Sequence, residues 1–352
     1  MQATFRHEAL FYAGFDEFLG GTLPFLREGI AAGEPALVVV DAAKIRALRA
    51  ALGSDAGSVQ FADMGVLGAN PARIIPAWRD FVDAHAVEGR PFRGIGEPVW
   101  TGRSPAELGE CQRHESLLNV AFSGAPAWWL VCPYDTKSLD RAIIDEARRS
   151  HPWVGHASLH EASPAYRGLE ASAITEPPLP PPGGDTRELA FGPRELGAVR
   201  KFTMNQATEA GLNDVQVADL VLVVNELATN SLRHGGGSGA LRMWNEGDVA
   251  VAEVSDAGYV SQPLVGRVRP TTQRENGRGI WLANQLCDLV QLRSSPDGTT
   301  VRVHMGGPAL VTAPPTRASG NGRAAKRARA TKPRRASQIG VETPTPPRVL
   351  AP

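Results

Sequence analysis

The sequence has few cysteines and no long apolar run, and both shortages restrict what the protein can be. Its three cysteines, Cys111, Cys132 and Cys287, are odd in number and widely spaced, which argues against a disulfide framework. No stretch approaches the ~20 apolar residues that a membrane-spanning helix needs. The first residues, MQATFRHEALFYAG, lack the basic and apolar segments of a signal peptide. We therefore expect a cytoplasmic protein with no membrane partner.

The chain also lacks an excess of charge of either sign, because 37 Lys and Arg residues balance 37 Asp and Glu residues. A balanced chain carries no overall field that would attract nucleic acid or a membrane surface. The final segment is an exception, with nine Lys and Arg between Arg317 and Arg348 against Glu342 alone. We interpret it as a solvated tail, and the alternative is weak, non-specific attraction to nucleic acid or an acidic partner.

Changes in composition divide the chain of 352 residues into four segments. Residues 1–168 and 188–308 have the apolar patterning of two domains, which suits a prior of ~100–200 residues per domain. Residues 169–187 form a linker, since EPPLPPPGGD is too rich in proline for a helix or a central strand. Residues 309–352 have almost no aliphatic patterning, so we expect a disordered basic tail.

The first domain alternates apolar strands with amphipathic helices. Helical spacing over Phe15–Ile30 is followed by the apolar run Pro35–Val40, which has the length and β-branching of a buried strand. The same alternation continues with the strands Ser58–Phe61 and Ala127–Cys132 and the helices Ala43–Leu52, Pro71–His85 and Ser138–Arg149. This order predicts an α/β fold with a mostly parallel sheet covered on both faces.

The second domain opens with two predicted helices, Pro193–Ala210 and Val215–Arg233, the second capped by Asn213 or Asp214. Glu226 and Asn230 are four residues apart, so they lie one turn apart on the same helix face. A carboxylate and an amide oxygen displayed together suit Mg²⁺, which prefers hard oxygen ligands. The carboxylate is alternatively suited to orient or deprotonate an attacking hydroxyl.

Two glycine-containing motifs follow this helix. The predicted strand Asp248–Val254 leads into Asp256, whose carboxylate can accept a hydrogen bond from the amine of adenine, and Gly258 allows close backbone approach. Further on, the glycines of NGRG open the predicted helix Ile280–Cys287, where free amides favour a phosphate. Two closing strands are predicted over Leu289–Ser294 and Thr299–His304.

These motifs, in this order, resemble those of the GHKL ATPase superfamily. The N box is matched by ELATNSLRHG, the first glycine box by VSDAGYV and the second by NGRGIWLANQLCD. The N box is most similar to that of anti-sigma-factor serine kinases. The resemblance covers about Phe191–Met305 and implies a GHKL (Bergerat) α/β sandwich that binds ATP and Mg²⁺. By this resemblance Glu226 is the catalytic base, Asn230 holds Mg²⁺, and the nucleotide is bound by Asn230, Asp256, Gly258, Gly277, Arg278 and Gly279.

The beginning of the chain resembles the MEDS sensory domain, which is often fused to such kinase modules in RsbA-family anti-sigma regulators. The match rests on FRHEALFYAGFDEFLGGTLPFLREGIAAGEPALVVV, on GIGEPVW, on ESLLN and on the Cys-Pro-Tyr-Asp that ends at Asp135. It covers about His7–Pro152 and implies a RecA-like α/β core with a parallel sheet. No G-x-x-x-x-G-K-[ST] phosphate loop is present, so we expect sensing here rather than ATP hydrolysis.

Polar residues beside the apolar strands are the candidates for sensing. We predict a pocket formed by His7, Glu97, Tyr134 and Asp135, and Trp100, Glu115 and Cys132 are further candidates. The competing interpretation places Trp128, Trp129 and Cys132 in the core, since a free cysteine behaves as a small hydrophobe. A metal or haem site at Cys111 and His114, three residues apart on a predicted helix, is the weakest alternative, because two ligands do not make a site.

Together the two resemblances imply a sensor-coupled regulator of a sigma factor. Such a protein binds Mg-ATP and phosphorylates a Ser or Thr of a STAS-type anti-sigma-factor antagonist, and it sequesters the sigma factor when the antagonist is phosphorylated. One alternative is a binding module that uses ATP without catalysis, because Val260 stands where the first glycine box often has a further glycine. A histidine kinase is the other, although no long helix pair with a phosphoacceptor histidine precedes the second domain. Assembly into a homodimer stays open.

Overall fold

The computed structural model describes residues 5–86, 91–156, 159–168, 178–270 and 277–306. The predicted linker falls partly outside these residues. The asparagine of the NGRG motif, Asn276, and the predicted tail (309–352) fall wholly outside them. Within the described ranges no helix is both long and apolar enough to cross a bilayer. The strands form two sheets, one of seven strands and one of five, which we call the N-terminal and the C-terminal sheet.

The N-terminal sheet has the strand order β3-β2-β4-β5-β1-β6-β7, with every neighbouring pair parallel except β6 and β7. Its strands are β1 (Arg6–Tyr12), β2 (Ala36–Val40), β3 (Val59–Asp63), β4 (Phe92–Gly96), β5 (Trp128–Asp135), β6 (Trp153–His156) and β7 (Leu159–Ala162). The helical segments between them are α1 (Phe15–Ala31), α2 (Ala42–Leu52), η1 (Gly53–Ser58), α3 (Met64–Leu67), η2 (Pro71–Arg73), α4 (Ile74–Ala86), α5 (Pro105–Ala121) and α6 (Arg141–Ser150).

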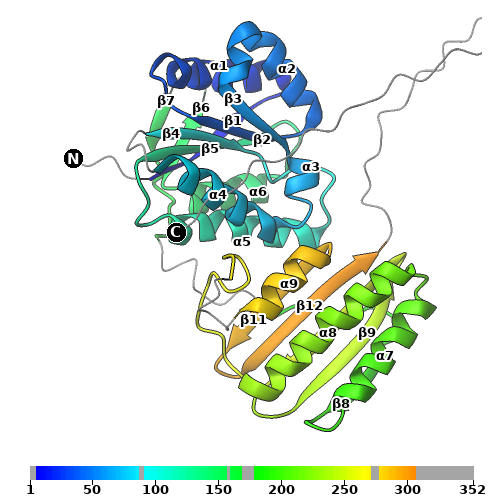
Figure 1. Ribbon diagram of the computed structural model, residues 1–352. Helices are drawn as coiled ribbons and strands as arrows, with labels where there is room; N and C mark the ends of the chain where they lie inside the picture. The colour runs from blue at the N-terminus through cyan, green and yellow to red at the C-terminus, as the bar shows by residue number, and fades with distance from the viewer. Residues whose placement is uncertain (1–4, 87–90, 157–158, 169–177, 271–276, 307–352) are drawn as a thin grey trace, which may run out of the picture. The chain divides into compact units, whose positions relative to one another are not determined.

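Helices cover both faces of this sheet, so its central strands are buried on both sides (Figure 1). Along β1, Leu10 and Tyr12 pack with α1 and α2, whereas Ala9 and Phe11 pack into the core that contains α4, α5 and α6. Successive side chains of a strand point to opposite faces, and β1 shows this directly. The predicted α/β fold with a parallel sheet is confirmed.

The C-terminal sheet is antiparallel, with the order β11-β12-β10-β9-β8. Its strands are β8 (Arg187–Phe191), β9 (Gly239–Glu246), β10 (Val249–Asp256), β11 (Leu289–Ser295) and β12 (Gly298–Gly306), and its helices are α7 (Leu196–Glu209), α8 (Asp214–His234) and α9 (Arg278–Leu286). The three helices lie against one face of the sheet, giving the predicted two-layer α/β sandwich (Figure 1). Val199, Val224 and Ala283, one from each helix, are fully buried in its core.

The length of α8 follows from its ends and its buried stripe. The side chain of Asn213 accepts hydrogen bonds from the amides of Val215 and Gln216, and the Gln216 side chain bonds back to the Asn213 amide in a capping box. Leu220, Val223, Val224, Leu227 and Ala228 form the buried stripe. The helix therefore presents a second, polar face that is free to carry chemistry.

Candidate functional site

Glu226 and Asn230 meet the beginning of α9. Both side chains are partly buried on α8. A Cβ atom added to Gly279, in the first turn of α9, would lie 2.8 Å from Nδ2 of Asn230 and 3.4 Å from Cβ of Glu226. Only a residue without a side chain allows the two helices to approach so closely. The structure thus brings the predicted base, the predicted metal ligand and one predicted phosphate-site glycine together.

Asp256 lies at the end of β10, and two donors hold its carboxylate. The Ser231 hydroxyl donates to Oδ2 over 2.6 Å, and the Gly258 amide donates to Oδ1 over 2.8 Å. Because Ser231 follows Asn230 on α8, the helix that carries the metal-ligand candidate also positions the carboxylate. A Cβ at Gly258 would lie 2.6 Å from the His234 carbonyl oxygen, so a side chain does not fit there. The carboxylate keeps further lone pairs with which to accept a donor.

The start of α9 has the geometry of an anion site. Gly277 adopts φ +91°, in the left-handed region that favours glycine, and it directly precedes the helix. No side chain among the described residues caps the first amides of α9, and the positive end of the helix dipole favours a phosphate. Arg278 is exposed at this end, whereas Gly279 is buried.

The described residues fit a nucleotide with a divalent cation. Asp256 supplies an acceptor fixed by two donors, Gly258 and Gly279 keep the site clear of side chains, and α9 supplies amides. Glu226 and Asn230 add side-chain oxygens, which divalent cations of the Mg²⁺ type prefer. Val260, where the first glycine box often has glycine, donates its amide to the Ser294 hydroxyl over 2.8 Å.

The four residues of the predicted sensory pocket do not form one group. Glu97 accepts hydrogen bonds from the Tyr12 hydroxyl at 2.5 Å and from Nζ of Lys44 at 2.6 Å, and burial raises its pKa to about 6 in spite of Lys44. His7 and Tyr12 are five residues apart on β1, so their side chains point to opposite faces and the sheet separates Glu97 from His7. The predicted pocket is divided because successive side chains of a strand point to opposite faces of the sheet, and the sequence motif alone does not show which face each residue occupies.

The other two predicted residues are also separated by strand alternation, because Tyr134 and Asp135 are neighbours on β5. Asp135 accepts hydrogen bonds from the Gly14 amide, far away in sequence, and from the nearby Ser138 hydroxyl. The Tyr134 ring lies edge-on to the His151 ring, with 5.7 Å between centroids. Whether any of these residues binds a signal stays a prediction.

His7 instead contacts Glu115 and Cys132, two of the further candidates, and His151, which the sequence did not suggest. Its Nε2 lies 3.1 Å from Oε2 of Glu115 and 3.4 Å from Sγ of Cys132, and its ring centroid lies 4.0 Å from that of His151. Burial, together with the neighbouring His151, lowers the pKa of His7 to about 4. No spacing pattern could have revealed this group, because its four members come from separate segments of the chain.

Three expectations about other side chains are resolved. Trp128 and Cys132 lie in the core, whereas Trp129 is partly buried. Cys111 donates to the Pro98 carbonyl oxygen at 3.3 Å, and burial raises the pKa of its thiol to about 12. Neither Cys111 nor His114 belongs to a group of three or more potential metal ligands among the described residues. The sequence also favours a helix or loop at His156 and His160, and the structure instead places them on β6 and β7.

Comparison with known proteins identifies both domains. Residues 6–152 match the model of the MEDS domain, described as the methanogen/methylotroph DcmR sensory domain, and residues 189–305 match that of the histidine kinase-like ATPase domain. The chain thus contains the two domains that its motifs predict. The second match indicates ATP-dependent kinase or ATPase activity in general, with ATP and a divalent metal ion.

A search of curated proteins finds no match. Among solved structures, the RsbU and RsbW domains of Rv1364c from Mycobacterium tuberculosis are similar at 17% identity over 35% of this chain and 32% of that chain, with a TM-score of 0.28. The match spans about a third of the mycobacterial chain.

Proposed function

We propose that this protein is a sensor-coupled, Mg-ATP-dependent serine/threonine kinase that phosphorylates a STAS-type anti-sigma-factor antagonist and thereby controls a sigma factor. The observation that carries the proposal is the contact of Gly279 with Glu226 and Asn230, beside an Asp256 held by Ser231. Residues of three motifs that are distant in sequence are thus connected through α8, which supports a site for phosphoryl transfer from ATP.

Asp256 reads the base in this proposal. With Ser231 and Gly258 donating to its two oxygens, the carboxylate cannot turn away, and its remaining lone pairs accept the exocyclic amine of adenine. Guanine presents a carbonyl oxygen at the corresponding position, so an acceptor-only carboxylate disfavours it. The site therefore prefers ATP over GTP.

The phosphates of ATP bind at the start of α9 in this proposal. The amides from Gly277 to Gly279 and the exposed guanidinium of Arg278 supply donors and positive charge there. Asn230 would hold Mg²⁺ through its amide oxygen, and when bound the ion neutralises charge on the phosphates.

Glu226 acts on the attacking hydroxyl. Its carboxylate orients the serine or threonine hydroxyl of the antagonist and accepts its proton. The hydroxyl oxygen forms a bond to the γ-phosphorus, the bond from that phosphorus to the bridging oxygen breaks, and ADP leaves with the electron pair. Positioning and charge stabilisation dominate this chemistry, so we expect Asn230 to matter most for binding and Glu226 for rate.

The test is transfer of label from ATP labelled at the γ-phosphate to a partner captured from the native host. We expect acid-stable phosphate on a small antagonist protein, dependent on Mg²⁺, and a sigma factor among the captured proteins. Acid-labile phosphate would indicate a histidine kinase and contradict the proposal. ATP binding without any transfer would equally contradict it and leave ATP-dependent partner exchange.

A further inference from the structure

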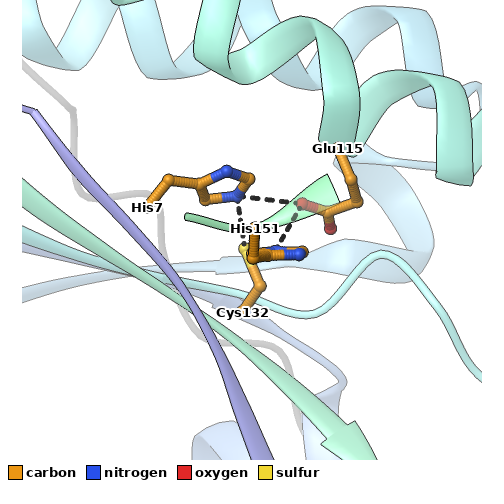
Figure 2. A group of neighbouring side chains, drawn as sticks. All are labelled: His7, Glu115, Cys132 and His151. Carbon is orange, nitrogen blue, oxygen red and sulfur yellow. Dashed lines mark hydrogen bonds and ion pairs between the residues drawn. The ribbon is translucent and has the colours of Figure 1, made fainter. Parts of the chain in front are cut away.

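Four fully buried side chains in the N-terminal sheet region offer metal-ligand atoms at one point. His7 lies on β1, Glu115 on α5, Cys132 on β5 and His151 directly after α6 (Figure 2). One donor atom from each lies within 4.8 Å of the other three. None of the four residues is more than 1% exposed to solvent. Such polar groups are costly to bury unless each finds a partner.

The rings of His7 and His151 are both oriented with Nε2 as an acceptor. Asn119 donates its amide to the Ser150 carbonyl oxygen at 2.7 Å, which turns Oδ1 of Asn119 toward Nδ1 of His7 at 3.0 Å. Nδ1 of His151 lies 2.8 Å from the Ala147 carbonyl oxygen, which can only accept. In both rings the proton is therefore on Nδ1, and Nε2 presents a lone pair.

Both lone pairs face a carboxylate oxygen. Oε2 of Glu115 lies 3.1 Å from Nε2 of His7 and 3.3 Å from Nε2 of His151. Oε1 of Glu115 and Nε2 of His151 are buried, and neither has a hydrogen-bond partner among the described residues. A single proton can join only one pair of these acceptors. A cation at the centre can bind both Nε2 atoms and one carboxylate oxygen at once.

We propose that His7, Glu115, Cys132 and His151 bind a divalent transition-metal ion, with Zn²⁺ the best match. Zinc takes four ligands in a tetrahedron at ~2.0–2.3 Å, which sets ligand-to-ligand separations at roughly 3.3–3.6 Å. The separations of 3.1, 3.3 and 3.4 Å between three pairs of ligand atoms lie at or just below this range, and all four atoms lie within 4.8 Å of one another, so binding the ion requires the side chains to draw closer together.

The donor set and the charge both select this class of ion. Two imidazoles and a thiolate are too soft for Mg²⁺ or Ca²⁺, but they suit zinc. On binding, Cys132 releases its thiol proton to solvent, and the metal–sulfur bond forms in its place. The doubly positive ion, one thiolate and one carboxylate then sum to zero charge, which a fully buried site requires.

The hydrogen bonds that the two histidines make through Nδ1 have the form found in metal centres. Metal-bound histidines usually donate their other ring N–H to a carbonyl or carboxyl-type oxygen, and His7 and His151 do so to Asn119 and Ala147. The ion would join β1, β5, α5 and the end of α6 at one point. It would therefore stabilise the packing of these two helices on the sheet.

The experiment uses the full chain without a histidine tag, stripped of metal and titrated with Co²⁺ as a spectroscopic probe. We expect one equivalent to bind, with the intense visible bands of tetrahedral cobalt and a thiolate-to-cobalt charge-transfer band. Cys132→Ser should abolish the charge-transfer band, and Cys111→Ser, a buried cysteine outside the group, should preserve it. Asn119→Ala should keep the band and weaken affinity ~10–100-fold.

Failure to bind one equivalent, or a charge-transfer band that persists in Cys132→Ser, would overturn the proposal. If Cys132→Ser does not fold, as judged by its ATP binding and circular dichroism, X-ray absorption of the zinc-loaded wild-type protein decides. One sulfur neighbour at ~2.3 Å with nitrogen and oxygen neighbours supports the site. A shell of nitrogen and oxygen alone contradicts it.

Discussion

The α8–α9 site and the buried group around His7 each contain a glutamate with amide or imidazole partners, yet their surroundings differ in every respect. Glu226 and Asn230 are partly buried beside Gly279 at the start of α9, and the atoms that they offer to a cation are oxygens. Glu115 is 1% exposed and faces two ring nitrogens and a thiol. An accessible oxygen site suits a nucleotide and cation that exchange, whereas a closed nitrogen and sulfur site suits an ion that stays.

The comparison teaches that residue type alone does not identify a site. A carboxylate beside an open helix end can move protons in turnover, because solvent and substrate reach it. A carboxylate that is buried among imidazoles cannot exchange protons in this way. Its negative charge can instead stabilise a bound cation. The predictions that follow test whether this division between an exchanging site and a closed site is real.

The largest expected effect is on catalysis at Glu226. Glu226→Gln keeps the shape of the side chain but cannot accept a proton, so phosphoryl transfer should fall ~10²–10⁴-fold while ATP affinity stays unchanged. Steady-state transfer and calorimetry measure the two quantities. Glu209→Gln, at an exposed glutamate of α7, is the matched control. Transfer at the wild-type rate would remove the catalytic role and favour the binding-module alternative.

Acid should destabilise the C-terminal domain through a buried histidine. His304 on β12 is buried against Gln291, with 3.1 Å between Nε2 and Oε1, and burial lowers its pKa to about 4. The unfolded chain, with a histidine pKa near 6.5, then binds more protons than the folded one between these values. Stability is therefore lost as pH falls from ~6.5 to 4, by at most about 3 kcal/mol for this residue.

His304→Gln tests this claim, because glutamine can still donate to Gln291 but does not titrate. We expect the pH dependence of the unfolding free energy to flatten in the C-terminal domain between pH ~6.5 and 4. Denaturant unfolding followed by bound-nucleotide signal gives that quantity. An unchanged slope would show that His304 does not carry the acid sensitivity.

A smaller effect is expected at Asp256, on affinity alone. Asp256→Asn replaces an acceptor-only group by one that can present a donor to the adenine amine, so ATP binding should weaken by ~1.5–3 kcal/mol. Asp297→Asn, in an exposed turn, controls for the loss of charge. Calorimetry with ATP and with GTP measures the change in affinity for each nucleotide. Unchanged ATP affinity in a folded variant would remove Asp256 from the site.

Much of the C-terminal fold could be predicted because its local signals agree with one another. Asn213 marks the start of α8, the apolar stripe marks its buried face, and Gly277 marks the start of α9. The strands that could not be predicted combine apolar residues with polar or charged ones. In β1 a buried histidine and glutamate interrupt the apolar run, and β9 carries Arg242 and Asn245 among its apolar residues.

The buried metal group was beyond the sequence for a different reason. His7, Glu115 and Cys132 could each be named as polar or reactive residues beside apolar segments. Their meeting with His151 depends on the parallel pairing of β1 with β5 and on where α5 and α6 lie on the sheet. Both depend on the tertiary structure, so the spacing of residues along the sequence does not predict them.

The central claim is that the α8–α9 site binds ATP through a divalent cation held by Asn230. Isothermal titration of ATP into the wild-type protein and Asn230→Ala, each with Mg²⁺ and with EDTA, tests it most directly, with Asn225→Ala on the same helix as control. We predict that EDTA weakens ATP binding to the wild type and to Asn225→Ala. Asn230→Ala should bind weakly in Mg²⁺ and no more weakly in EDTA. Mg²⁺-dependent binding at the wild-type level in Asn230→Ala would contradict the account.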